Sequence, residues 1–81
     1  MPEFDLTIAT PQKQLFKDKA ESVNAPSEEG YMTILAGHAP LLANLTKGKV
    51  TIKAATDTKE FDITGGFIEV NEKGVIILVK Q

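Results

Sequence analysis

The 81-residue sequence has no cysteine, no tryptophan and only one histidine. Without cysteine, neither disulfides nor thiolate-bound metal can stabilise the chain, which fits a reducing compartment. No segment approaches the roughly 20 apolar residues that a membrane-spanning helix needs. The N-terminus also lacks a basic region followed by an apolar run, so we expect neither a secretory signal nor direct membrane insertion.

Neither charge sign is in large excess, since the net charge is −2 and lysines are interspersed with acidic residues along the chain. Nucleic-acid-binding proteins need a basic stripe to meet the phosphate backbone, and single-strand binders add stacking aromatics. Neither feature is present. The composition therefore predicts a protein that does not bind nucleic acid.

Apolar residues are sufficient for one folded core. Leu, Ile, Val and Phe make up 23 of the 81 residues, above the level at which disorder is expected. A chain of this length forms one domain, so residues 1–81 are predicted to be a single unit.

The first half of the chain predicts strands. Apolar and polar residues alternate from Phe4 to Ile8, which is the period of a half-buried strand. Thr10-Pro11 ends this strand. We expect one bent edge strand between Leu15 and Ala25, where charged residues discourage pairing between molecules, and a turn over Pro26 to Glu29.

The second half repeats this pattern. Alternating strands are expected around Val50–Ala54, Phe61–Ile63, Phe67–Val70 and Val75–Val79, and Gly65-Gly66 is read as a tight connection that needs positive φ. Only Leu41–Leu45 could instead form a short helical turn. The prediction is an all-β fold, a flattened sandwich or barrel of about 8–10 short, mostly antiparallel strands.

Glu29 to Leu42 is the most distinctive stretch. Gly37 can adopt positive φ, and Pro40 fixes φ and lacks an amide donor, so the chain should reverse here in a shaped loop that displays His38. Leu41-Leu42 follow at once. Two interpretations remain open: the loop contacts a partner, or the leucines are core and His38 is an incidental surface residue.

The last strand is apolar on both faces. Ile76 and Leu78 alternate with three valine and isoleucine positions that suit the core, whereas a strand with one solvated face should carry polar residues there. Either another strand of the domain covers Ile76 and Leu78, or these residues form a second interface for a partner or a missing segment.

The sequence contains no recognisable arrangement of catalytic side chains. His38 is the only candidate base, and Ser22 and Ser27 are the only serines, neither in a nucleophile turn. One histidine and scattered acids give no metal-ligand spacing, and no glycine motif cradles a phosphate. We predict no catalytic residue, no cofactor and no metal, and the residues favour a β-domain that binds another protein.

Several motifs resemble one family, the epsilon subunit of the F-type ATP synthase, called delta in mitochondria, in its N-terminal β-domain. They occur in the family's order and cover essentially the whole chain: Thr10-Pro11, Glu29-Gly30, Gly37-His38-Ala39-Pro40-Leu41-Leu42, Gly48-Lys49-Val50 and Thr64-Gly65-Gly66-Phe67-Ile68-Glu69-Val70. Thr33 and Ala36 replace the usual Gly and Pro, and Tyr31 stands where an acid is common. Family members usually continue into a helical hairpin that inhibits ATP hydrolysis, and we expect it to be absent here.

The resemblance implies a non-catalytic subunit of the central stalk that links the gamma subunit to the c-ring and couples proton flow to ATP synthesis. It implies a peripheral location, on the cytoplasmic face of a bacterial inner membrane or the equivalent organellar face. The contacts with gamma and the c-ring would come from Tyr31 and the Gly37-to-Leu42 loop, with Thr10 nearby, and His38 would donate or accept interface hydrogen bonds. The implied contact residues are Thr10, Tyr31, Gly37, His38, Ala39, Pro40, Leu41 and Leu42.

Two other functions remain as alternatives. One is a free-standing β-sandwich module that binds a ligand or protein around His38, and a ligand would need an enclosed apolar pocket beside the loop. The other is a small hydrolase that uses His38, which would need a nucleophile placed next to it.

Overall fold

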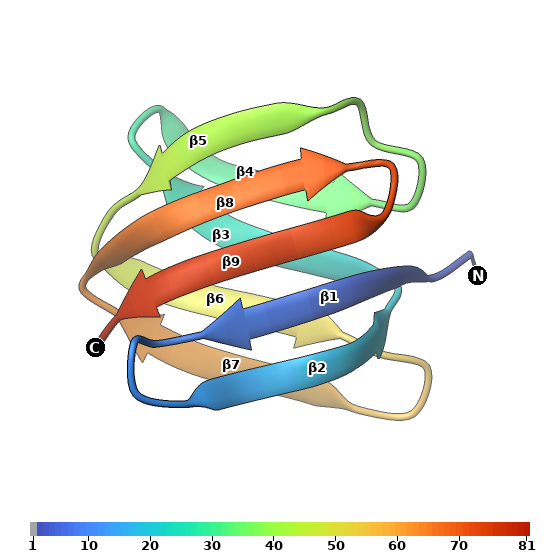
Figure 1. Ribbon diagram of the computed structural model, residues 1–81, viewed down its shortest axis with the longest axis horizontal. Coiled ribbons are helices and arrows are strands. Elements are labelled where there is room, and N and C mark those ends of the chain that lie inside the picture. Colours follow the sequence, from blue (N-terminus) through green and yellow to red (C-terminus); the bar gives the residue numbers. More distant parts are fainter. Residues whose placement is uncertain (1) are drawn as a thin grey trace.

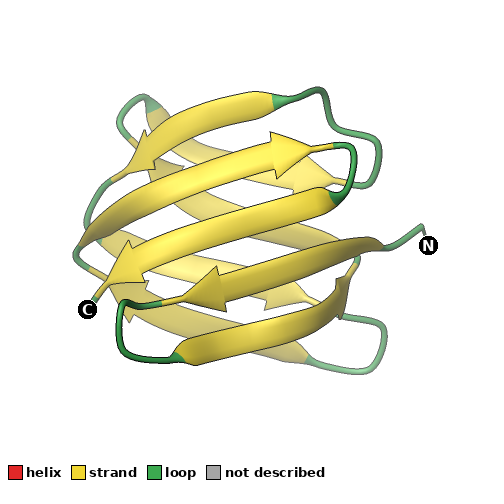
Figure 2. Cartoon of the chain, in the orientation of Figure 1, coloured by secondary structure: helices red, strands yellow, loops and turns green. Residues whose placement is uncertain are grey.

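Nine strands make up the fold. The computed structural model describes residues 2–81, which form strands joined by short loops, with no helix among them (Figures 1 and 2). No described segment is therefore a helix that could cross a membrane. The strands are β1 (Phe4–Ala9), β2 (Gln14–Ala20), β3 (Ser22–Ser27), β4 (Gly30–Leu35), β5 (Leu41–Leu45), β6 (Gly48–Lys53), β7 (Thr58–Ile63), β8 (Gly65–Asn71) and β9 (Gly74–Lys80).

The strands form one continuous sheet that curls into two layers. Its order is β2-β1-β9-β8-β5-β3-β6-β7, with β4 paired to β3. In Figure 1 the front layer consists of β5, β8, β9, β1 and β2, and the back layer of β4, β3, β6 and β7. The layers join where Ser27 pairs with Leu45, and the Thr46 N–H donates to the Pro26 carbonyl at 2.8 Å. The predicted all-β sandwich is thus confirmed.

One pair of strands is parallel. β1 lies beside β9 with Leu6 opposite Val75 and Ile8 opposite Ile77, and all other pairs are antiparallel. This pairing brings the first and last strands together at the centre of the front layer. β1 and β9 are the first and last strands of the described chain. No short turn joins them, so no turn sets the register between them.

The core lies between the two layers. Alternate residues of each strand point inward, as in β9, where Val75, Ile77 and Val79 are buried while Ile76 and Leu78 are not. No polar or charged side chain of residues 2–81 is buried. The core consists of Leu6, Ile8, Phe16, Ala20, Val23, Ala25, Ile34, Leu45, Val50, Ile52, Ile63, Ile68, Val70, Val75, Ile77 and Val79.

The expected single strand from Leu15 to Ala25 is wrong, because two strands meet at Glu21. β2 pairs with β1 in the front layer, whereas β3 pairs with β4 and β6 in the back layer. The chain therefore changes layer at Glu21, whose N–H donates to the Lys53 carbonyl at 2.7 Å. Of these two strands, β2 lies at an edge of the sheet and β3 lies in its interior.

Three smaller expectations are also corrected. The Gly65-Gly66 turn is wrong, because both residues belong to β8 and Thr64 alone connects β7 to β8. Gly66 is nearly extended, and a Cβ there would collide with the Leu78 carbonyl oxygen of the neighbouring strand. The turn expected over Pro26 to Glu29 is shorter, since β3 includes Pro26 and β4 begins at Gly30. Leu41–Leu45 forms β5 and not a helical turn.

Gly48 is packed too tightly for a side chain. A Cβ at this position would lie 2.6 Å from the Tyr31 hydroxyl and 2.9 Å from the Pro26 ring. We predict that Gly48→Ala lowers the free energy of unfolding by about 1–3 kcal/mol, the usual cost of overpacking. Gly65→Ala is the matched control, because its Cβ would meet only the Leu45 carbonyl at 3.7 Å. Urea unfolding that finds the two variants equally stable would contradict this packing.

An exposed ion pair joins β1 to β2. Lys19 lies opposite Asp5 in the ladder, and its Nζ is 2.8 Å from the Asp5 carboxylate. The hydrogen bond and the charge of Asp5 raise the pKa of Lys19 above its ordinary value. A raised pKa stabilises the fold while the lysine is protonated, and this contribution is lost as the pH rises through the folded-state pKa.

We predict that Asp5→Asn lowers the pKa of Lys19, as NMR titration of the lysine side chain would measure. Glu60→Gln is the matched control, because Glu60 pairs with Lys49 and not with Lys19, and it should leave the pKa of Lys19 unchanged. A Lys19 pKa that Asp5→Asn also leaves unchanged would show that Asp5 does not act on it.

Candidate partner-binding surfaces

The loop between β4 and β5 displays the histidine. Gly37 has a φ of 81°, which favours glycine, and the His38 N–H donates to the Leu35 carbonyl at 3.2 Å to close the turn. The His38 ring is exposed, and its Nδ1 lies 2.7 Å from the carbonyl oxygen of Ala39. This contact requires a hydrogen on Nδ1, so the neutral ring presents Nε2 to solvent as an acceptor. Such a ring suits a surface hydrogen bond.

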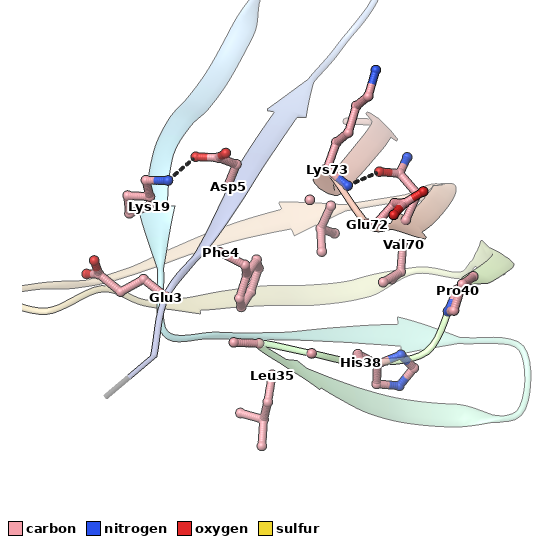
Figure 3. Close-up of a pocket in the computed structure, with 15 residues that line it drawn as sticks. Glu3, Phe4, Asp5, Lys19, Leu35, His38, Pro40, Val70, Glu72 and Lys73 are labelled. Atoms are coloured by element: carbon pink, nitrogen blue, oxygen red, sulfur yellow. Dashed lines mark hydrogen bonds and ion pairs between the residues drawn. The ribbon is translucent and has the colours of Figure 1, made fainter.

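A shallow depression lies beside this loop. It is open to solvent and is bordered by the loop, the start of β1 and the turn between β8 and β9 (Figure 3). Charged residues line much of it, including the Asp5–Lys19 pair, Glu72 and Lys73. The ligand-binding alternative needs an enclosed apolar pocket here. The depression does not meet that requirement.

Two of the predicted contact residues lie far from the loop. Thr10 follows β1 at the end opposite to Asp5, which lines the depression beside His38. The expectation that Thr10 lies near the loop is therefore wrong, because β1 runs along the sandwich between them (Figure 1). The Thr10 hydroxyl accepts hydrogen bonds from the N–H groups of Gln12 and Lys13, at 3.2 and 3.1 Å, and shapes the β1–β2 turn.

Tyr31 lies near the hairpin that joins β3 to β4. Its side chain is 60% exposed, and its hydroxyl accepts a hydrogen bond from the Lys49 N–H at 3.2 Å. The ring is thus anchored at its tip while one face remains accessible. Tyr31 and Thr10 belong to the end of the sandwich opposite to Gly37–Pro40 (Figure 1).

The outer face of the front layer carries an apolar patch. Its four members, Leu42, Phe67, Ile76 and Leu78, are 65%, 38%, 42% and 53% exposed. We call this set the front-face patch. Phe67 lies directly opposite Leu78, and Glu69 lies between Leu42 and Ile76 in the register. The patch therefore spans the neighbouring strands β5, β8 and β9, with Glu69 between Leu42 and Ile76.

This finding excludes one of the two explanations for the apolar last strand. Among residues 2–81 no strand covers Ile76 and Leu78, so that explanation is wrong, and the interface with a partner or a missing segment stays a prediction. Phe67 was not among the predicted contact residues. The alternation of β8 could have identified it, because Ile68 and Val70 face the core and Phe67 must then face outward. Leu35, 51% exposed at the end of β4, was also missed.

The outer face of the back layer is polar at its middle, and its exposed apolar residues, Tyr31 and Leu35, lie on the edge strand β4. Thr33, Asn24, Thr51 and Glu60 lie opposite one another across β4, β3, β6 and β7. The Asn24 amide donates to the Thr33 hydroxyl at 2.9 Å and to the Met32 carbonyl at 3.2 Å. The two outer faces of the sandwich therefore differ in chemistry. Within residues 2–81, no group of three or more His, Asp or Glu side chains could hold a metal ion.

Similarity to known proteins extends over the whole chain. Residues 3–81 match the family described as "ATP synthase, Delta/Epsilon chain, beta-sandwich domain". The chain is 40% identical to the ATP synthase epsilon chain of Caulobacter vibrioides, covering 100% of this chain and 94% of that protein. It is 43% identical to the epsilon chain of Chlorobaculum tepidum, covering 96% and 90%. The match to the Caldicellulosiruptor saccharolyticus epsilon chain, at 38% identity, spans 57% of that protein.

Two solved structures share the fold. One is a chain from the central stalk and c-ring of the Tetrahymena thermophila mitochondrial ATP synthase, with a TM-score of 0.84 at 22% identity, covering 99% of this chain and 65% of that chain. The other is a chain of the Euglena gracilis mitochondrial ATP synthase, with a TM-score of 0.84 at 23% identity, covering 100% and 52%. With the sequence matches and the observed sandwich, these findings show that the chain belongs to the ATP synthase delta/epsilon family and carries its β-sandwich domain.

Proposed function

We propose that this protein is a non-catalytic subunit of the central stalk of a proton-translocating F-type ATP synthase, where it links the gamma subunit to the c-ring. It would be peripheral to the membrane and part of the rotor. Support comes from relatives that bear the name ATP synthase epsilon chain. A subunit that links gamma to the c-ring needs protein-binding surfaces on a stiff domain and needs no catalytic groups.

The front-face patch is the observation that carries the proposal. Four large apolar side chains stand exposed on adjacent strands, whereas β3, β6 and β7 of the back layer expose no large apolar side chain among the described residues. Contiguous exposed apolar surface on a small domain marks an interaction site. We assign this patch, with Leu41, Leu42 and the neighbouring Gly37–Pro40 loop, to the gamma subunit. Removing it from water would supply the binding free energy, and His38 would add a hydrogen bond.

The opposite end of the sandwich suits a different partner. It carries the anchored Tyr31 and the polar turn after β1, with Thr10, Gln12 and Lys13. We assign this polar end to the polar loops of the c-ring. A subunit held at two separate surfaces binds more tightly than either contact alone, because the second contact is intramolecular.

The connections of the sandwich support a mechanical role. Thr64 alone joins β7 to β8, and two residues each join β3 to β4 and β8 to β9. Short connections between neighbouring strands leave little loop to deform. A domain that passes torque from one partner to another should not absorb it by bending.

The proposal predicts that a charge in the front-face patch weakens binding to the cognate gamma subunit. Leu78→Asp should raise the Kd by about 10- to 100-fold, since burying one such side chain contributes about 1.5–3 kcal/mol. Leu42→Asp should act in the same direction. Size-exclusion co-elution and a titration against gamma would measure both.

Thr58→Asp is the matched control, because Thr58 is exposed on β7 in the back layer. It adds the same charge away from the patch and should bind gamma like the unaltered protein. The assignment of the patch is wrong if all three variants bind alike. The proposed function itself is wrong if the unaltered protein and a folded gamma subunit do not associate at micromolar concentration.

A further inference from the structure

The sandwich has two open sides, where the edges of its layers are not paired with each other. On one side the edge strands are β2 in front and β7 behind, and on the other they are β5 in front and β4 behind (Figure 1). We call them the β2–β7 side and the β4–β5 side. An unpaired strand edge offers backbone donors and acceptors to any strand that approaches it.

The β2–β7 side is protected against such pairing. β2 contains Lys17, Asp18 and Lys19, and β7 contains Lys59, Glu60 and Asp62. The Lys59 ammonium group also lies 5.8 Å from the centroid of the Phe16 ring and so links the two edges. Charged side chains on edge strands are the usual means of preventing strand addition.

The β4–β5 side has no such protection. Neither β4 nor β5 contains a charged residue. Within the described residues β4 pairs only with β3, and β5 pairs with β8 along its length but with β3 only at Leu45. The free edge of β5 therefore runs from Leu41 to Asn44. Three exposed apolar side chains, Tyr31, Leu35 and Leu42, lie on these two strands.

A groove follows this side of the molecule. Its walls include Met32 from β4, Leu41 and Ala43 from β5, and Phe67 from the front-face patch. Glu28 and Glu29 line one end, and no lysine lines any part of it. The groove therefore suits an extended, uncharged segment with a Lys or Arg where it passes the hairpin that joins β3 to β4.

We infer that the β4–β5 side binds an extended strand of the gamma subunit, which pairs with the free edge of β5 and places a cation beside Glu28 and Glu29. The inference rests on the proposed function and adds to it a mode of binding, β-strand addition. β5 is the acceptor because an added strand would extend the front layer next to Leu42. The front-face patch and the strand contact would then form one continuous interface.

A second copy of this chain fits the groove less well. The groove of a second copy contains no lysine, so it would bring no cation to Glu28 and Glu29. Charges left without a complementary partner in an interface disfavour association. Self-association is therefore a competing outcome that the test must separate from binding to gamma.

Amide hydrogen exchange, resolved by NMR in the free protein and in the complex with gamma, tests the inference. In an antiparallel pair, alternate amides of β5 bond to β8 and the others point to the free edge. We expect the free-edge amides between Leu41 and Asn44 to exchange at least tenfold more slowly in the complex. Amides on the open edges of β2 and β7 should not change.

Charge reversal provides a second readout. Glu29→Lys should weaken binding to gamma by about three- to tenfold, because it repels the partner's cation. Asp57→Lys also reverses one charge, in the exposed turn between β6 and β7 of the back layer, and serves as the control. It should bind like the unaltered protein.

The outcomes are distinguishable. A complex in which the free-edge amides of β5 exchange as fast as in the free protein overturns the strand addition but leaves the proposed function standing. Absence of any complex overturns both. Slow exchange of the same amides in the free protein, together with a dimer in sedimentation experiments, would identify a second copy as the occupant and overturn the assignment to gamma.

Discussion

The fold depends on one constraint: its interior is made only of aliphatic side chains and one phenylalanine, with no polar side chain buried among residues 2–81. Such a core is stabilised by removing apolar surface from water and by close packing. The polar side chains of the described residues therefore lie on the outer faces, ends and edges of the sandwich, where a partner can reach them.

Those surfaces are not equivalent. The front layer presents Leu42, Phe67, Ile76 and Leu78 to solvent. The back layer presents hydroxyl, amide and charged groups on β3, β6 and β7, with exposed Tyr31 and Leu35 only on β4. The two open sides differ in the same way, since β2 and β7 are charged and β4 and β5 are not. The apolar face and the uncharged side meet at Leu42. A single partner that covers both would bury a continuous surface.

Much of the architecture could be predicted from the alternation of apolar and polar residues, because a buried residue in a strand makes its two neighbours point to the opposite face of the sheet. The apolar last strand also predicted an unusual face, and Ile76 and Leu78 are indeed exposed. Local patterns did not predict where the chain changes layer at Glu21, nor that Thr10 and His38 lie at opposite ends. Both depend on the pairing of β1 with β9 and of β3 with β6, which join distant segments. Phe67 could be recognised as a surface residue only once its register with Leu78 was known.

The central claim is that the front-face patch is covered by another subunit in the assembled ATP synthase. Hydroxyl-radical footprinting tests it directly, by comparing the oxidation rates of Phe67, Ile76 and Leu78 in the free protein and in the intact complex. Phe61, half-buried on β7 of the back layer, is the internal reference. We expect the three patch residues to be oxidised several-fold more slowly in the complex while Phe61 is unaffected. Equal rates for Phe67 and Leu78 in both states would contradict the account.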